Sequence, residues 1–326
     1  MSRKAEIFAA SAGGHLDLLR AIAPQVLDGR EPVWVTSSTP RGESLKESAS
    51  QVELLPEYER SPFRAVRNVV EAARLVRRRR PRTVVTSGAG VVAPFCLFAR
   101  LSGARLVFVE TMARVNSPSM TARLLSRVAE RVVVQWPELA PALPRAVVCR
   151  PTLLENLSDG RLQPGSGTFV AVGTHGQPYT RLLEMVSRAV EDGLLPRPLR
   201  AQLGSAAWSA PGVEASEHMS RDELEAAVRS ADVVVCHGGA GIISSALAAG
   251  RRPIVVPRRA ALGEHVDDHQ YQLTRKLAQW GLVVAVEERL TADDVDSARR
   301  PLRVPRELRE RPTAAQVLEA ALDGSG

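Results

Sequence analysis

The sequence of 326 residues predicts an α/β protein built from two doubly wound, Rossmann-like domains, each with a parallel sheet. Apolar strand-like runs alternate with helical periods along the chain, which favours crossover helices between parallel strands. Several of these runs end in a glycine turn that opens a helix. A polar, glycine-rich stretch at residues 157–167 is the best candidate for a linker. We therefore expect one domain over residues 1–156 and another over 168–326, facing each other across a ligand cleft.

The predicted strands are short, apolar runs that end in glycine, proline or polar residues. The first half contains them at Ala5–Ala10, Pro32–Thr36, Thr83–Ser87, Arg105–Val109 and Arg131–Gln135. The second half contains them at Thr168–Val172, Arg200–Leu203, Val233–Cys236, Pro253–Val256 and Leu282–Val286. A terminal helix is predicted at Pro312–Leu322, where a proline starts the run and apolar residues recur at helical spacing. This helix falls within the second predicted domain.

The composition is that of a soluble globular protein, because 44% of the residues are hydrophobic and 24% are charged. Apolar runs stay shorter than the roughly 18 to 20 residues of a membrane span, and the first residues lead straight into a strand. We expect a cytoplasmic protein without a cleaved signal. Cys96, Cys149 and Cys236 lie in or beside apolar runs without metal-ligand spacing, so we interpret them as buried thiols.

The formal charge of +7 raises the question of an anionic partner. Only 4% of residues are aromatic, and basic stretches are not interleaved with stacking aromatics, so we expect no nucleic acid partner. A helix is predicted over residues 63–76, with Phe63, Val66, Val70 and Ala73 forming one apolar face. Two interpretations of the Arg74–Arg82 region stay open: solvated arginines, or peripheral contact with an anionic membrane at about 1 kcal/mol for each arginine.

The turn that follows the strand at residues 233–236 is the most informative motif. It reads His237, Gly238, Gly239, Ala240 and Gly241, and a helix begins at once. Glycines let a backbone approach an anion, and the free N–H groups of a first helical turn bind a diphosphate without a metal. The alternative for the histidine is a core residue that bonds the backbone. The polar run at residues 258–270, after the next strand, is expected at the same edge of the sheet.

Glycine turns follow three more predicted strands. In the first, Gly13 and Gly14 precede His15. An imidazole beside a helix N-terminus stays neutral near pH 7, so His15 is our candidate for a general base, against the alternative of an ordinary tight turn. The second turn contains Gly88 and Gly90, which either admit a second substrate or pack helix on sheet.

Residues near two other predicted strands complete the candidates. Glu110 ends a strand near Arg114, which suggests a structural ion pair, an acceptor contact, or catalysis by the carboxylate. Gly173 and Thr174 open the second half in a further glycine turn. Five of the six histidines lie in these candidate loops, which favours a site over chance; they are His15, His175, His237, His265 and His269.

Together these motifs resemble family 28 glycosyltransferases. The second half resembles the donor-nucleotide domain, through the Gly173 turn, the His237 turn, residues 250–257 and residues 268–270. Residues 257–265, together with residues 268–270, are similar to bacterial exopolysaccharide and capsule transferases. The first half resembles their acceptor-binding partner subunit through residues 13–16, 88–90, 94–96, 117–119 and 135–138, with Glu110, Arg114 and Thr121. In the eukaryotic dolichol-linked N-acetylglucosamine transferase these are separate chains; here they are fused.

The resemblance implies a GT-B fold and an inverting transfer from a UDP-sugar to a lipid-linked sugar acceptor, with no cofactor and no metal in the site. It implies catalysis by His15 or Glu110. It implies acceptor contacts from Gly13, Gly14, Gly88, Gly90 and Arg114. It implies donor contacts from Gly173, Thr174, His237, Gly238, Gly239, Ala240, Gly241, Arg258, His269 and Gln270. Ser245 stands where the lipid II enzyme has a glutamate for the ribose, so ribose recognition is expected to differ.

Three alternatives remain beside this function. In the first, the enzyme transfers the sugar to a soluble natural product. In the second, the protein is a UDP-sugar epimerase of the same architecture. In the third, it is an inactive nucleotide-sugar-binding scaffold. The resemblance also implies that any membrane contact is peripheral, on the inner face of the plasma membrane, because the N-terminal anchor of the eukaryotic acceptor subunit is missing from this sequence.

Overall fold

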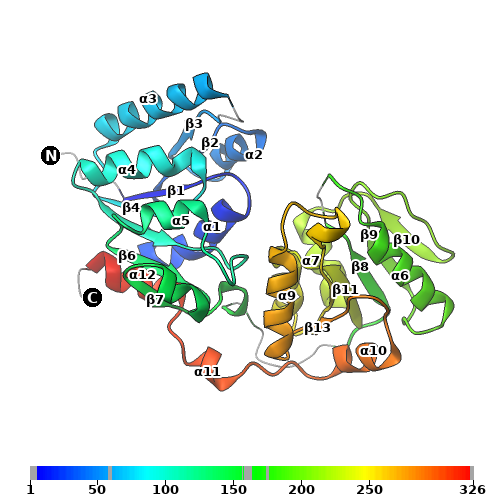
Figure 1. The fold of residues 1–326 in the computed structure, drawn as a ribbon. Coiled ribbons are helices and arrows are strands. Elements are labelled where there is room, and N and C mark those ends of the chain that lie inside the picture. The colour runs from blue at the N-terminus through cyan, green and yellow to red at the C-terminus, as the bar shows by residue number, and fades with distance from the viewer. Residues whose placement is uncertain (1–5, 58–60, 156, 158–163, 174–175, 324–326) are drawn as a thin grey trace. The chain divides into compact units, whose positions relative to one another are not determined.

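The computed structural model describes residues 6–57, 61–155, 157, 164–173 and 176–323. The chain forms two compact units, each described by itself below (Figure 1). The first contains residues 1–152 together with 311–326, and the second contains residues 153–310. The predicted boundary therefore needs a correction: the C-terminal residues from Arg311 on belong with the first unit, whereas the sequence had suggested the second.

The first unit is built on a parallel sheet of seven strands in the order β3-β2-β1-β4-β5-β6-β7. Its strands are β1 (Glu6–Ala10), β2 (Val33–Ser37), β3 (Val52–Leu55), β4 (Thr83–Gly88), β5 (Arg105–Val109), β6 (Arg131–Val134) and β7 (Ala146–Val148). Its helices are α1 (Gly14–Leu27), α2 (Pro40–Glu43), α3 (Pro62–Arg79), α4 (Ala93–Leu101), α5 (Met120–Leu125) and α12 (Ala314–Asp323). The strand order reverses between β1 and β4, so a ligand crevice is expected beyond the carboxyl ends of these two strands.

Helix α12 packs against α1 on one face of this sheet (Figure 1). Its apolar residues share a core cluster with α1 and the central strands; they are Ala314, Ala315, Val317, Leu318 and Ala321. Polar bonds hold it as well, since Arg105 Nη1 donates to the Leu322 carbonyl at 2.7 Å. Burial of a valine or leucine side chain contributes roughly 1.5–3 kcal/mol, so Val317 and Leu318 favour the return of this segment to the first unit.

The second unit contains a parallel sheet of six strands in the order β10-β9-β8-β11-β12-β13. Its strands are β8 (Thr168–Ala171), β9 (Leu199–Gln202), β10 (Val213–Ser216), β11 (Val233–His237), β12 (Ile254–Val256) and β13 (Val284–Ala285). Its helices are α6 (Thr180–Glu191), α7 (Arg221–Ser230), α8 (Ala240–Ala248), α9 (His269–Gln279), α10 (Ala292–Arg299) and α11 (Arg306–Arg309). Here the order reverses between β8 and β11, at the Gly173 and His237 turns.

The prediction of two parallel-sheet domains is confirmed, and every predicted strand is present with small shifts at its ends. Strands β3, β7 and β10 were not predicted. The three cysteines are buried thiols, as expected. None of the helices in the described part of the chain is long and apolar enough to cross a membrane.

The apolar residues that were predicted to share one face of α3 are mostly exposed. Phe63 is 82% exposed and Val66 is 64% exposed, and Val70 is also exposed. The helix instead buries Asn68, Ala72, Leu75 and Val76. Asn68 explains why α3 is turned with the predicted apolar residues outward, because its side-chain amide donates to the carbonyls of Pro56 at 2.8 Å and Val91 at 3.1 Å.

Candidate functional site

The first candidate site lies at the carboxyl ends of β1 and β4. His15 is half-buried in the first turn of α1, and its Nδ1 lies 2.8 Å from the Ser87 carbonyl oxygen at the end of β4. Ser87 Oγ donates in return to the His15 carbonyl at 2.9 Å. Gly13, with φ of 113°, permits the turn, and α1 has no side-chain cap. The turn is therefore tied to both central strands, as the sequence predicted for a strand-end histidine.

The protonation of His15 follows from these contacts. A carbonyl only accepts, so Nδ1 carries the hydrogen and the neutral ring presents a free lone pair at Nε2. Burial lowers the pKa of His15 below its ordinary 6.5, while the Ser87 bond and the Glu110 charge oppose this shift and Arg114 adds to it. The imidazole is thus a neutral base near pH 7.

Glu110 is completely buried after β5. One carboxylate oxygen accepts from the Thr111 N–H at 2.9 Å, and the other accepts from the Ser119 N–H, also at 2.9 Å. Both oxygens are therefore used to hold the loop at residues 111–119. This arrangement favours the structural interpretation of Glu110 over a catalytic one. Arg114 belongs to the same loop and acts electrostatically on His15, so the structure brings these residues together.

Gly88 and Gly90 are separated by Ala89, which itself has φ of 78°. A Cβ on Gly88 would lie 3.0 Å from the Phe108 ring and 3.2 Å from Thr121. Packing therefore accounts for Gly88, the simpler of its two predicted roles. Gly90 is exposed and starts a short 3-10 turn, Gly90–Val92.

The second candidate site surrounds His237, at the end of β11. Its Nδ1 lies 3.3 Å from the Ala171 carbonyl oxygen of β8. A Cβ on Gly173 would come within 2.6 Å of His237 Nε2, and one on Gly239 would come within 2.2 Å. The imidazole is wedged between two glycines, neither of which has room for a side chain. With Nδ1 protonated, the ring donates to an anion through Nε2 only when it becomes imidazolium.

Helix α8 starts beside this ring with Gly239 as its N-cap and without a side-chain cap. The N–H groups of its first turn, from Ala240 and Gly241, remain available to a ligand oxygen, and the helix dipole adds positive potential there. A Cβ on Gly241 would meet nothing within 4 Å, so this end is open. Gly238, by contrast, is closely packed, since a Cβ added to it would lie 2.9 Å from the Gln270 Cβ.

Arg258 needs a correction to its predicted role. Its side chain is buried, 1% exposed, and Nη1 donates to the carbonyls of Gln177 at 2.9 Å and Glu264 at 3.2 Å. Nη2 donates to the Val172 carbonyl at 3.3 Å, and the guanidinium lies 4.5 Å from the Tyr179 ring centre. Burial lowers the pKa of Arg258. The guanidinium therefore joins two loops, the one after β8 and the one after β12, which favours a structural role for Arg258 over the predicted donor contact.

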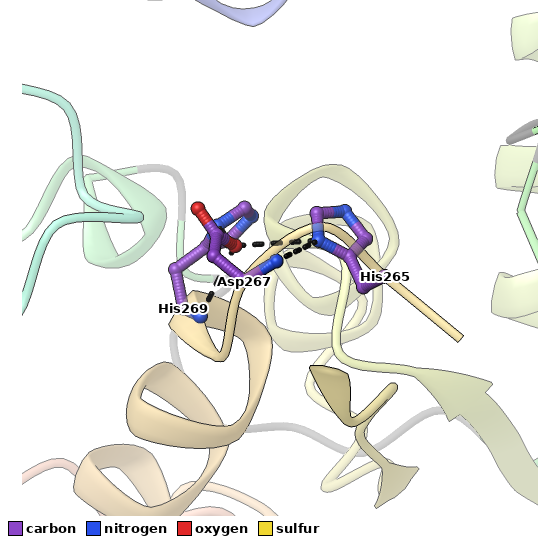
Figure 2. A group of neighbouring side chains, drawn as sticks. All are labelled: His265, Asp267 and His269. Atoms are coloured by element: carbon purple, nitrogen blue, oxygen red, sulfur yellow. Dashed lines mark hydrogen bonds and ion pairs between the residues drawn. The ribbon is translucent and has the colours of Figure 1, made fainter. Parts of the chain in front are cut away.

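Gln270 and His269 begin α9 beside this site. Gln270 is 6% exposed, and its Oε1 accepts from the Arg258 N–H at 3.3 Å. His269 is more open and lies against Asp267 and His265 (Figure 2). The structure thus brings Gln270 next to the His237 turn, at Gly238. Thr174 and His175 lie outside the described residues, so the predicted donor contact of Thr174 remains a prediction.

Two supporting interactions escaped the sequence reasoning. The Gln202 amide pairs with Gly173, accepting from its N–H and donating to its carbonyl, both at 3.1 Å. Arg181 forms a two-point ion pair with Glu264, at 2.7 and 2.9 Å. The only signal for Gln202 was a polar residue at the end of an apolar strand. The Arg181 pair spans 83 residues, so no local pattern reveals it.

Known proteins match both halves of the chain. The family described as "Oligosaccharide biosynthesis protein Alg14 like" matches residues 51–150. The family described as "Glycosyltransferase family 28 C-terminal domain" matches residues 168–322. The matches therefore cover the two halves that the sequence had suggested.

Curated relatives share one name, UDP-N-acetylglucosamine--N-acetylmuramyl-(pentapeptide) pyrophosphoryl-undecaprenol N-acetylglucosamine transferase. The relative from Aeromonas hydrophila subsp. hydrophila is 32% identical over 232 residues, which cover 68% of this chain and 62% of the relative. The relative from Nitrosococcus oceani is 30% identical over 299 residues, covering 83% of this chain and 81% of the relative. The chain thus spans about three fifths of the first relative's length and four fifths of the second's.

Solved structures show the fold. MurG from Acinetobacter baumannii has a TM-score of 0.67 at 19% identity, covering 99% of this chain and 100% of that chain. The UDP-GlcNAc 2-epimerase from Methanocaldococcus jannaschii has a TM-score of 0.68 at 10% identity, covering 98% and 99%. The fold is GT-B, with two parallel-sheet domains, as the resemblance implied. The likeness to the Nitrosococcus relative over most of both chains identifies the family: this chain belongs to the family 28 glycosyltransferases.

Proposed function

We propose that the protein is an inverting glycosyltransferase that moves a sugar from a UDP-sugar to a lipid-linked sugar acceptor. The observation that carries this proposal is the uncapped N-terminus of α8 beside the wedged His237 ring. A helix N-terminus with glycines in front of it is suited to a diphosphate, because its N–H groups and dipole stabilise negative charge. The same charge grows on the leaving group during transfer, so these groups assist the reaction without requiring a metal at the diphosphate.

The acceptor would be activated by His15. Its Nε2 carries the lone pair, so this atom takes the proton of the acceptor hydroxyl as the hydroxyl oxygen attacks the anomeric carbon. The bond from the anomeric carbon to the diphosphate oxygen breaks in the same step, and UDP leaves. Glu110 supports the base indirectly, by holding the loop at residues 111–119 and by its charge.

The names of the relatives guide the choice of substrates. They are transferases of N-acetylglucosamine from its UDP derivative, and their acceptor is a sugar on pyrophosphoryl-undecaprenol. We therefore propose UDP-N-acetylglucosamine as donor and a polyprenyl-diphosphate-linked sugar as acceptor. The exopolysaccharide or capsule role that the sequence resemblance implied receives no support from these names.

The decisive assay mixes the purified full chain with labelled UDP-N-acetylglucosamine and a short-chain polyprenyl-diphosphate N-acetylmuramyl peptide. Transfer of label to the lipid with release of UDP is expected. Isomerisation of the sugar nucleotide without acceptor would select the epimerase alternative. Transfer only to soluble aglycones would select the natural-product alternative. Failure of UDP to bind or to stabilise the protein would refute the donor site itself.

We also propose that α3 mediates peripheral contact with an anionic membrane. Phe63, Val66, Val69 and Val70 are exposed on this helix. Arg64, Arg67, Arg74 and Arg77 are exposed on it as well. Apolar side chains that enter the headgroup region together with arginines near anionic lipids are typical of interfacial helices. Arg74, Arg78 and Arg79 contribute less free charge, because Arg74 pairs with Glu71 and the other two pair with Glu53.

Vesicle sedimentation tests the membrane proposal. Wild type should bind vesicles that contain phosphatidylglycerol and should bind phosphatidylcholine vesicles weakly. The double variant Phe63→Ser, Val66→Ser should lose binding. The matched variant Leu262→Ser, at an exposed apolar residue of the second unit, should retain it. If the double variant binds these vesicles as well as Leu262→Ser does, α3 is not the membrane contact.

A further inference from the structure

Three side chains that bind metals in many proteins gather just before α9. His265, Asp267 and His269 alternate along the chain, so the loop presents all three on one side (Figure 2). One potential ligand atom from each lies within 4.8 Å of the others. Among the described residues, this is the group of histidine, cysteine and acidic side chains that meets this spacing. The donor-site chemistry described above does not use the cluster as a unit.

The distances are close to those of a tetrahedral metal site. His265 Nδ1 lies 3.3 Å from Asp267 Oδ1. Two ligands of a tetrahedral zinc ion, each bonded at about 2.0–2.1 Å, lie about 3.3 Å apart. His269 Nδ1 makes a closer contact with the same carboxylate oxygen. A bound ion would replace this contact with two metal bonds, and it requires only a small withdrawal of the His269 ring.

The donor atoms select the kind of ion. Two imidazole nitrogens and one carboxylate oxygen suit Zn²⁺ and its first-row neighbours, whereas Mg²⁺ and Ca²⁺ prefer oxygen ligands throughout. The side chains are partly exposed, at 10% for His265, 37% for Asp267 and 26% for His269, so an ion reaches them from solvent. Three protein ligands leave a fourth position for water or substrate.

Two nearby arginines are already paired with carboxylates. Arg181 pairs with Glu264 at 2.7 Å, and Arg259 lies 3.5 Å from Glu287 and over the Tyr271 ring. Asp268, next to the cluster, accepts from the Ala260 N–H at 2.8 Å and adds a negative charge. The local electrostatics are therefore compatible with a divalent cation.

We propose that His265, Asp267 and His269 form a binding site for a divalent transition-metal ion, best matched by Zn²⁺. The ion would fix the loop that leads into α9. Its effect on donor binding rests on the proposed function: if His269 contacts the donor sugar, an ion that occupies His269 competes with the UDP-sugar. Metal binding itself does not depend on that function.

The test measures Zn²⁺ binding to the untagged full chain, stripped of metal, by competition with a chromophoric chelator. Wild type should bind one Zn²⁺ at this site and should show no comparable affinity for Mg²⁺. His265→Gln and His269→Gln keep similar size and polarity, and each should weaken Zn²⁺ at least about tenfold. His218→Gln, at an exposed histidine outside the cluster, is the matched control and should leave affinity unchanged.

The outcomes separate the site from the enzyme function. Absence of saturable Zn²⁺ binding by wild type would overturn the proposal, and so would equal affinity in the cluster variants and the His218→Gln control. Thermal melting of each variant without metal establishes that it is folded. A protein that binds Zn²⁺ through the cluster but does not bind UDP would retain the metal site and lose the proposed donor site.

Discussion

The two histidine turns are built from similar residues and yet position their rings differently. Both rings bond a carbonyl of the neighbouring central strand through Nδ1, at 2.8 Å for His15 and 3.3 Å for His237. His15 follows its two glycines and stands on the helix, where a Cβ on Gly13 or Gly14 would meet nothing within 4 Å. His237 precedes its glycines and ends the strand, and its ring lies between Gly239 and Gly173 of the neighbouring turn.

The order of histidine and glycine therefore decides what each turn can do. The turn of the first unit leaves space around a neutral base, which suits removal of a proton from a bulky acceptor. The turn of the second unit surrounds a ring with backbone, which suits a fixed wall beside an anion. The comparison shows that a role can be assigned to a glycine-histidine motif only after considering whether the histidine stands before or after the glycines in the chain.

The largest expected effect is on kcat, and it separates the chemical step from UDP binding. His15→Gln should reduce kcat about 10²- to 10⁴-fold, because it removes the base, while the affinity for UDP should stay within about twofold of wild type. Steady-state kinetics and calorimetry with UDP measure the two quantities. Wild-type turnover by the folded variant would end the assignment of His15 as base.

A variant of Arg258 tests whether its buried guanidinium is needed to hold the loops beside the His237 turn. Arg258→Met removes three hydrogen bonds to carbonyls and should lower the free energy of unfolding by about 3 kcal/mol. Arg275→Met changes an exposed arginine of α9 and should stay within about 0.5 kcal/mol. Urea unfolding compares the two variants. Equal stabilities would show that the buried guanidinium is not needed to hold these loops.

Two alanine variants test the difference between the two turns in the room that is available for a Cβ. Gly239→Ala places a Cβ 2.2 Å from His237 Nε2, so the ring or the backbone must move, and UDP affinity should fall at least about tenfold. Gly14→Ala at the other helix start meets no atom within 4 Å and should leave both folding and UDP affinity unchanged. The comparison fails if both variants bind UDP alike.

Glu110 sharpens the electrostatic part of the comparison. Its charge raises the pKa of His15, so Glu110→Gln should lower that pKa further and move the acid limb of the kcat/KM profile to lower pH. A loss of 10²-fold or more at every pH, without this displacement, would instead indicate that Glu110 is the base.

The smallest effect is on stability as a function of pH. The pKa of His15 is 6.5 in its ordinary state and lower in the folded protein. Below pH 6.5 the unfolded chain therefore binds the proton more readily, and stability decreases as the pH falls. His15→Gln should remove this contribution, so its melting temperature should decline less than that of wild type between pH 7 and pH 5. Parallel curves for the two proteins would contradict the lowered pKa.

The sequence predicted most of the fold because central strands of parallel sheets are buried on both faces and read as apolar runs. The three strands that were not predicted, β3, β7 and β10, all lie at sheet edges and are only partly buried. An edge strand needs fewer apolar residues, so its pattern is weak. The glycine turns were placed correctly for the same reason that their strands were.

Other features depended on contacts between distant segments. The face of α3 was reversed because Asn68, a polar residue, bonds two buried carbonyls and turns the apolar residues outward. Arg258 looked like a ligand contact, since a buried arginine that joins two loops has the same sequence signature as one that faces an anion. Such roles are fixed by tertiary partners, which periodicity does not reveal.

The return of α12 to the first unit has a consequence for synthesis. Residues 153–310 leave the ribosome before the helix that completes the core around α1 has been made. The first half of the chain must therefore wait, with part of its apolar surface uncovered, while an entire second domain is translated and folds. The domain whose translation starts first is therefore the last whose core can be completed.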